Sequence, residues 1–131
     1  MATAKGFREL DVYKKALLQA GQIFRATASF PSEEKYALTD QVRRSSRAVG
    51  ALVAEAWARR RYRAAFISKL VEALGEAMET QAWLDHARLC RYVSDAQYRD
   101  LDREWQQIGG MLRRMIQCAD RFCTSASDKK P

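Results

Sequence analysis

Apolar residues recur three or four positions apart along most of the chain, which is the spacing of helices that bury one face. The pattern predicts a first helix over residues 7–28. Pro31 ends this helix, because the residue before a proline is disfavoured in the helical region. Ser32 with two glutamates after it has the pattern of a helix start, and it opens either a short helical turn or the second helix itself.

The stretch from residue 39 to 63 has arginines at both ends and a nearly uncharged, apolar middle. The rest of the chain is organised around this stretch. In its middle, Glu55 is the single ionisable residue between Ala48 and Ala58. At helical spacing this segment is apolar on more than one side, so it needs more than one neighbour. We expect the second helix to run to about residue 61. The positions of the wide apolar stripe are Val42, Ser45, Val49, Leu52, Val53, Ala56 and Trp57.

A third helix is predicted over residues 63–92, joined to the second by a tight turn or by a kink around residues 60–62. Ser94 and Gln97 then have the spacing of a capping box, in which the serine oxygen binds the glutamine amide and the glutamine side chain binds back. A fourth helix follows this box and continues to about residue 122.

Four amphipathic helices with short connections predict an all-α fold, an antiparallel up-down-up-down four-helix bundle. We expect the bundle domain to span residues 1–123 and residues 124–131 to be a disordered polar tail. Long helices with wide stripes often leave apolar surface that one bundle does not cover, and self-association buries such surface. The candidates for this surplus surface are Leu18, Leu52, Trp57, Trp83 and Trp105.

Composition agrees with a compact helical domain, since 47% of the 131 residues are hydrophobic and only six are Gly and two Pro. The N-terminus lacks the apolar region of a signal peptide, and no run approaches the roughly 20 apolar residues of a membrane span. We therefore expect a cytoplasmic protein. Cys90, Cys118 and Cys123 form no C-x-x-C pair, which predicts reduced, partly buried thiols.

The net charge is +7, and residues 1–63 carry all of the excess. A basic surface attracts polyanions, nucleic acid first among them, and arginine forks match phosphate geometry. Neither helix-turn-helix spacing nor the interleaved aromatic residues of a single-strand platform stand out, so contacts to backbone phosphates rather than bases are expected. The candidate nucleic-acid-binding residues are Arg43, Arg44, Arg47, Arg59, Arg60, Arg61 and Arg63.

A protein-interaction scaffold is the alternative function, with the same arginines serving contacts between copies or with a partner protein. The salt dependence of binding to RNA or DNA separates the two, because phosphate contacts weaken steeply as salt rises.

Candidate chemistry argues against an enzyme and against a cofactor. A carboxylate-bridged metal site in a bundle needs Glu-x-x-His on two helices, and the chain has one histidine, His86. Cys90 lies four residues after it without a third orienting group. Glu55 and Glu79 stand in runs poor in charge, and we expect them to be structural buried acids that meet an arginine, a backbone amide or water. An enzyme with these two acids in acid–base roles is a third reading.

Two blocks of sequence carry a resemblance to a known family. Residues 7–13 read F-x-x-L-x-V-Y, and residues 30–44 read F-P-x-x-E-x-Y-x-L-T-x-Q-x-R-R. Further matching positions are Ala54, Glu55, Arg59, Gly75, Glu79, Leu84, Tyr92, Tyr98, Leu101, Met111 and Leu112. With these positions, the chain resembles the bacterial four-helix bundle family of the 23S rRNA intervening-sequence proteins. It is also similar to the accessory variability protein of diversity-generating retroelements.

The resemblance implies an antiparallel four-helix protomer of a ring-like homopentamer, with a basic surface and no known catalytic activity. In the retroelement relatives that surface is associated with nucleic acid and with a reverse transcriptase. The expected partners are therefore other copies of the chain, RNA or DNA, and a reverse transcriptase or other protein, but no membrane. The basic positions shared with the family are Arg43, Arg44 and Arg59, and Glu55 is the shared acid.

The chain departs from the family at the end of the second helix. Family members commonly read N-I-A-E-G-x-G-R there, whereas this chain has Leu52, Ala56 and Ala58 at the asparagine and the two glycine positions. These substitutions replace a polar, flexible helix end with a more regular apolar one.

Overall fold

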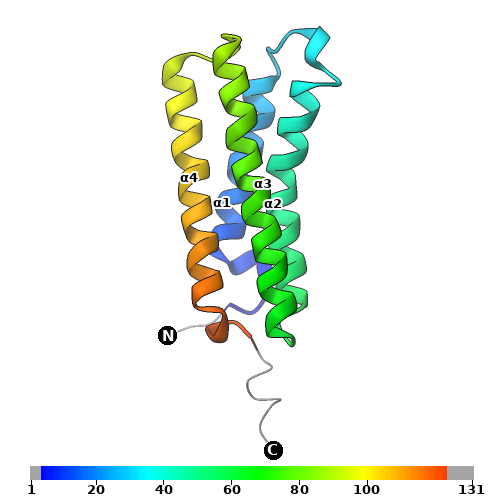
Figure 1. Ribbon diagram of the computed structural model, residues 1–131, viewed down its shortest axis with the longest axis vertical. Helices are drawn as coiled ribbons and strands as arrows, with labels where there is room; N and C mark the ends of the chain where they lie inside the picture. Colours follow the sequence, from blue (N-terminus) through cyan, green and yellow to red (C-terminus); the bar gives the residue numbers. More distant parts are fainter. Residues whose placement is uncertain (1–3, 124–131) are drawn as a thin grey trace, which may run out of the picture.

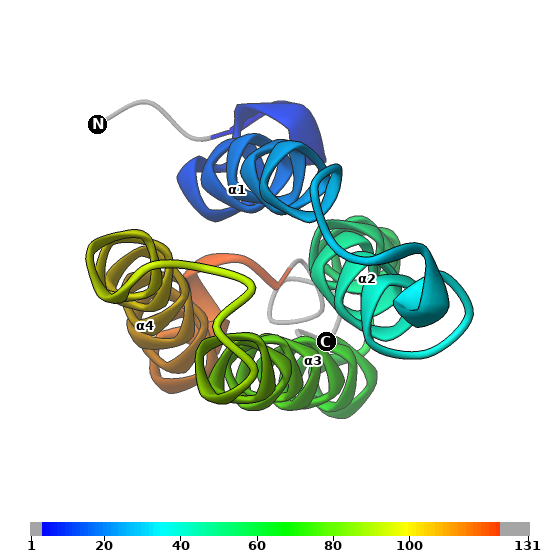
Figure 2. The same cartoon turned by 90° about the horizontal axis from the view of Figure 1, so that it is seen from above.

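The protein is described here by a computed structural model in which residues 4–123 are placed, and four long antiparallel helices dominate it (Figure 1). Viewed along the bundle, the helices stand at the four corners in chain order (Figure 2). No strand occurs among residues 4–123, so the predicted all-α four-helix bundle is confirmed. The long helices are α1 (Asp11–Thr27), α2 (Leu38–Ala58), α3 (Arg63–Leu89) and α4 (Asp95–Gln117), and the 3-10 helices are η1 (Phe7–Glu9), η2 (Ser32–Glu34) and η3 (Ala119–Arg121).

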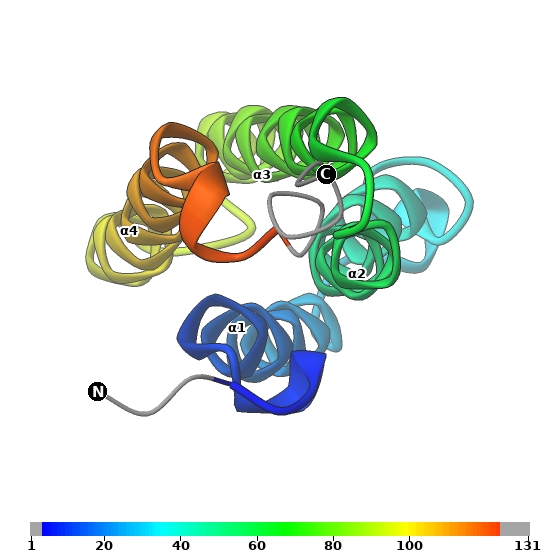
Figure 3. The same cartoon turned by 90° about the horizontal axis from the view of Figure 1, so that it is seen from below.

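The two ends of the bundle are built differently. At one end, residues 59–62 connect α2 to α3, and η1 and η3 lie alongside (Figure 3). We call this the arginine end. At the other, residues 90–94 connect α3 to α4, and η2 lies in the connection from α1 to α2. We call this the capped end.

The first predicted helix is broken near its start. Leu10 adopts an extended backbone (φ −71°, ψ 129°) that separates η1 from α1. The Leu10 side chain at this bend is buried in the core. Periodicity therefore located the helix and missed the bend.

Glu34 fixes the start of α2 at the capped end. Of the two readings for Ser32, the short turn is correct, because Ser32 opens η2 and α2 begins only at Leu38. The N–H of Leu38 donates to Oε1 of Glu34 at 3.3 Å, and the Tyr92 hydroxyl donates to Oε2 at 2.8 Å. One carboxylate thus satisfies an orphan amide of α2 and ties that helix to the α3–α4 connection.

The later boundaries fall close to prediction. The second helix stops at Ala58 and the third at Leu89, each three residues early, and α4 gives way to η3. The capping box is confirmed, since Gln97 N–H donates to Ser94 Oγ at 3.1 Å and Ser94 N–H to Gln97 Oε1 at 2.9 Å.

The core is centred on Trp105, the largest fully buried side chain. It shares one face of α4 with Ile108 and Leu112, so the expectation that Trp105 supplies surplus surface is wrong. Leu18 is 58% exposed, as expected. The other three candidates for surplus surface, Leu52, Trp57 and Trp83, are partly buried and pack against the core.

None of the helices in the described range combines the length and apolarity needed to cross a membrane.

Candidate nucleic-acid interface

Residues 59–63 form a tight turn at the arginine end, which we call the arginine loop. Arg59 N–H donates to Ala56 O at 2.9 Å, and Tyr62 N–H donates to Arg59 O at 2.9 Å. These bonds hold the backbone as the chain leaves α2 and enters α3, so the prediction of a tight turn around residues 60–62 is the correct alternative. Four arginine side chains leave this one turn.

Arg60 and Arg63 have partners that orient their side chains. The Arg60 guanidinium lies 3.7 Å from the centre of the Trp57 ring, and its Nε donates to Trp57 O at 2.9 Å. Arg63 Nε pairs with Asp120 Oδ1 at 2.7 Å. The Asp120 side chain is 78% exposed, and such surface ion pairs contribute only about 0–1 kcal/mol, so a phosphate can compete for Arg63.

Arg59 and Arg61 are exposed on the same loop. No carboxylate occurs in the sequence from residue 56 to 66. The loop therefore gathers positive charge at one end of the bundle, where its own sequence holds no carboxylate and the exposed Asp120 pairs with Arg63.

The remaining candidate arginines lie on the first half of α2. Arg47 lies just over three turns of helix before Arg59, which places the two groups about 18 Å apart at 1.5 Å per residue. The seven candidates therefore divide into two separate groups.

The side chain of Arg43 makes hydrogen bonds within the protomer. Its Nε donates to Thr27 Oγ1 at 2.8 Å, one terminal nitrogen donates to Phe24 O at 3.3 Å, and the guanidinium lies 4.5 Å from the centre of the Phe24 ring. These contacts join α2 to the end of α1. Arg43 is thus a structural residue, and we leave it out of the candidate interface.

Arg44 and Arg47 are exposed but face local partners. Arg44 donates to Gln41 Oε1 at 3.1 Å, and Arg47 lies 5.6 Å from the centre of the Phe24 ring. Burial, followed by the charge of Glu79, raises the pKa of the Glu76 carboxyl, and Arg44 partly opposes that rise. An acidic stretch of α3 therefore lies near Arg44 and weakens its attraction for a polyanion.

The prediction that Glu55 is buried is wrong. Its side chain is 50% exposed and pairs with Lys69 Nζ at 3.3 Å across the α2–α3 boundary. Glu79 is only partly buried and accepts a hydrogen bond from Trp83 Nε1 at 3.2 Å. Both acids have partners, but a lysine and an indole take the place of the expected arginine, amide or water.

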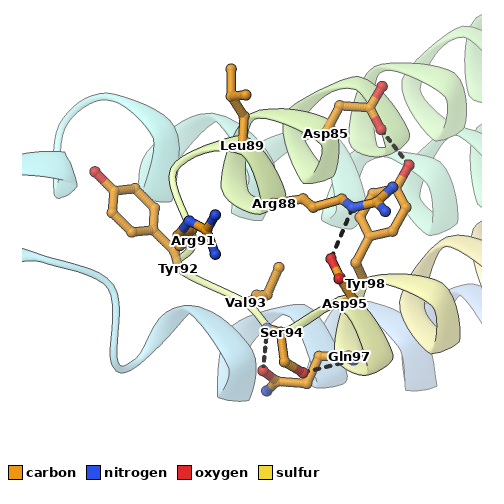
Figure 4. A pocket seen from close by; sticks show the side chains of 10 residues that line it. All are labelled: Asp85, Arg88, Leu89, Arg91, Tyr92, Val93, Ser94, Asp95, Gln97 and Tyr98. Atoms are coloured by element: carbon orange, nitrogen blue, oxygen red, sulfur yellow. Dashed lines mark hydrogen bonds and ion pairs between the residues drawn. The ribbon is translucent and has the colours of Figure 1, made fainter.

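The capped end holds a cleft of about 900 Å³ between the end of α3 and the start of α4 (Figure 4). Arg88 Nε pairs with Asp95 Oδ1 at 3.2 Å, and its guanidinium lies 4.6 Å from the centre of the Tyr98 ring. The Tyr98 hydroxyl donates to Asp85, and this bond raises the pKa of Tyr98 to about 12. The charges of this cleft are thus largely matched within the protein.

Arg91 has an unusual backbone conformation. Its φ is +62°, which makes it the one non-glycine residue with positive φ among residues 4–123. Tyr92 N–H donates to Ala87 O at 2.9 Å, and Arg91 N–H donates to Arg88 O at 3.0 Å. This pair of bonds is a Schellman motif, in which glycine is the preferred residue at the left-handed position.

The candidate metal ligands and thiols are not brought together into a metal site in the described range. No group of three or more His, Cys, Asp or Glu is placed to hold a metal ion. His86 packs on the Trp83 ring, with the ring centres 5.6 Å apart. Within residues 4–123 no disulfide joins Cys90, Cys118 and Cys123, and Cys90 is exposed rather than partly buried as expected.

Sequence reasoning missed the aromatic residues of the arginine end. Trp57 and Tyr62 flank Arg59, Arg60 and Arg61 in the sequence, and Tyr62 is 63% exposed. The spacing was visible in the sequence, but the helical pattern also allowed both aromatic side chains to be buried.

Comparisons with known proteins agree on one family. The family described as 23S rRNA-intervening sequence protein matches residues 8–114. A crystal structure of a protein of unknown function from the S23 ribosomal protein family of Bacteroides thetaiotaomicron VPI-5482 is 32% identical, with a TM-score of 0.74. The similarity covers 81% of this chain and 95% of that one. A comparison with curated proteins found no match.

Proposed function

Because the chain belongs to the 23S rRNA-intervening sequence protein family, we propose that it is a non-enzymatic bundle that binds nucleic acid through the arginine loop. One observation carries the proposal: four arginines leave a single turn, and no carboxylate lies between residues 56 and 66. A guanidinium group can donate two parallel hydrogen bonds to the oxygens of one phosphate. The loop supplies several guanidinium groups at one end of the bundle. The contacts are to the phosphate backbone, so base sequence has little effect on affinity.

The second arginine group has a smaller part in this proposal. Arg44 and Arg47 are exposed and extend the basic surface along α2, whereas Arg43 holds α1 against α2. Binding is therefore centred on the arginine end.

A salt titration tests the function. Fluorescence anisotropy of labelled RNA and DNA measures the association constant as salt rises, and each neutralised phosphate contributes about 0.7–0.9 to the slope of log K against log salt. The Arg59→Ala/Arg61→Ala variant is expected to lower both the low-salt affinity and this slope. The matched control is Arg99→Ala/Arg103→Ala, which removes the same charge from exposed positions of α4.

Two outcomes would overturn the proposal. One is that the wild-type protein binds neither RNA nor DNA at low salt. The other is that the two double variants lose the same affinity, which would assign binding to net charge rather than to the arginine loop.

We also propose that the protomers assemble into a ring-like homo-oligomer, a homopentamer by family resemblance, and act as an accessory to a nucleic-acid enzyme such as a reverse transcriptase. Exposed apolar residues support assembly, since Leu17 and Leu18 on α1 are 60% and 58% exposed. Analytical ultracentrifugation measures the subunit count, and Leu17→Ser/Leu18→Ser is expected to lower it. A monomeric wild-type protein would contradict the assembly.

The same leucines favour the second candidate function, a protein-interaction scaffold. This function replaces the first if the wild-type protein sediments as an oligomer but binds no nucleic acid.

A further inference from the structure

Tyr62 stands in the middle of the arginine loop with its side chain 63% exposed. Its backbone is fixed on both sides, because its N–H donates to Arg59 O and its carbonyl accepts from Phe66 N–H, both at 2.9 Å. Within residues 4–123 no hydrogen bond or ring contact engages the Tyr62 side chain. The ring is therefore presented to solvent from a rigid turn.

A second flat surface lies at the same turn. The Arg60 guanidinium lies 3.7 Å from the centre of the partly buried Trp57 ring, and its bond to Trp57 O holds it there. A guanidinium held over an indole offers a planar face that stacks on aromatic rings, including nucleobases. Tyr62 and the guanidinium of Arg60, held on Trp57, thus supply two planar groups in the arginine loop.

Tyr36 shows that exposure alone does not make such a site. Its side chain is 85% exposed, more than that of Tyr62, and Lys35 lies 5.3 Å from the centre of its ring. However, Tyr36 follows Glu33 and Glu34 in the connection to α2, where acidic side chains repel phosphates. The neighbouring charges distinguish Tyr62 from Tyr36.

We propose that the arginine loop binds unpaired nucleotides, with phosphates on its arginines and a base stacked on Tyr62. The inference rests on the proposed function and adds the form of nucleic acid that the site prefers. In a duplex both faces of each base are covered by neighbouring bases, so an exposed ring on a protruding turn meets only phosphates and sugars. A single strand can turn a base outward onto the ring, and such stacking tolerates every base.

The test compares Tyr62→Leu with Tyr62→Phe. Binding of a labelled oligopyrimidine strand and of the duplex it forms with its complement is measured by anisotropy at the same low salt. The wild-type protein is expected to bind the single strand more tightly. Tyr62→Leu should weaken single-strand binding by about 5- to 150-fold, the range for loss of one base–aromatic stack, with little effect on duplex binding. Tyr62→Phe keeps the ring and should keep the affinity.

The salt dependence of binding distinguishes the loss of a base stacked on Tyr62 from the loss of a charged contact to phosphate. Tyr62→Leu should leave the slope of log K against log salt unchanged, because the substitution removes no arginine or lysine that contacts a phosphate. Tyr36→Leu is the matched control and should bind like the wild type, and thermal melting confirms that each variant is folded.

Equal affinity of Tyr62→Leu and the wild-type protein for the single strand would overturn the inference. A parallel loss for single strand and duplex would also overturn it. In both cases salt-sensitive binding through the arginines would remain, and the proposed function would stand. Failure of the wild-type protein to bind either nucleic acid would instead remove the proposed function.

Discussion

The two ends of the bundle both present arginines, but their surroundings differ. At the capped end, Arg88 lies between the carboxylate of Asp95 and the ring of Tyr98, and Arg43 is bound to the end of α1. At the arginine end, residues 56–66 contain four arginines and no carboxylate, and Arg63 pairs with the exposed Asp120 of η3. The number of arginines is therefore a poor guide to where a polyanion binds. The number of carboxylates and carbonyl groups that already accept hydrogen bonds from those arginines is a better one.

This difference also separates stability from binding. An arginine whose donors are satisfied inside the protein contributes to folding, whereas an exposed one with a weak surface partner can exchange that partner for a ligand. Substitutions at the capped end should change the free energy of unfolding, whereas substitutions in the arginine loop should change affinity and leave stability nearly constant.

Arg43→Ala should give the largest loss of stability. It removes two hydrogen bonds to α1 and the contact with the Phe24 ring, which together amount to about 2–3 kcal/mol. Urea denaturation measures the loss. Arg59→Ala is the control and should change stability by at most about 0.5 kcal/mol, as exposed substitutions usually do. Equal midpoints for the two variants would break the comparison.

Arg91→Gly should stabilise the protein by about 0.5–1 kcal/mol. Glycine adopts the positive φ of the Schellman motif without the steric penalty that Arg91 bears. The greater conformational entropy of glycine in the unfolded chain offsets part of this gain. Arg91→Ala removes the same charge but keeps the penalty, so it should show no such gain. If both variants were stabilised alike, charge rather than backbone conformation would be the cause.

Alkaline pH should loosen the capped end. Hydrogen bonds to Glu34 and Asp85 raise the pKa values of Tyr92 and Tyr98, respectively, from 10.0 to about 12. The folded protein holds these protons at a pH where the unfolded chain releases them, so the stabilisation is complete below pH 10 and is lost as the pH rises towards 12. At pH 9 the melting temperature of the Tyr92→Phe/Tyr98→Phe variant should be lower than that of the wild-type protein. Above pH 9 it should fall less steeply with pH than the wild-type melting temperature does.

Tyr62→Phe is the control for that experiment, because it removes a hydroxyl that bonds to no carboxylate within residues 4–123. A control that flattened the pH profile as much as the double variant would show that the two tyrosine–carboxylate bonds are not responsible.

Glu55→Ala should have the smallest effect. Its ion pair with Lys69 is half exposed, and such pairs contribute about 0–1 kcal/mol. A loss above about 2 kcal/mol by urea denaturation would mean that Glu55 acts as a buried acid after all.

Much of the fold could be read from local sequence. The spacing of apolar residues located four helices, and the capping box at Ser94 needed only residues three apart. The orientation of Trp105 could not be read in this way, because it depends on which face of α4 meets the other helices. Glu55 was misplaced for a related reason, since apolar neighbours in sequence do not reveal that one side of the helix faces solvent.

The site was harder to predict than the fold. The acceptors that occupy Arg43 lie 16 and 19 residues before it and meet it only when α1 packs on α2. Spacing alone therefore grouped Arg43 with the exposed arginines. The loop arginines were identified because they follow one another in sequence, but the exposure of Tyr62 among them required the turn itself.

The three tryptophans, of which Trp105 is fully buried, can serve as intrinsic fluorescent reporters of different parts of the bundle. The three tryptophans sit at three heights: Trp57 at the arginine end, Trp105 at mid-bundle and Trp83 towards the capped end. Emission from the buried indole of Trp105 should shift to longer wavelength when the interior opens to water, while Trp57 beneath the Arg60 guanidinium is placed to be quenched by a docked strand. Single-tryptophan versions would let unfolding and ligand capture be followed separately without attaching a dye.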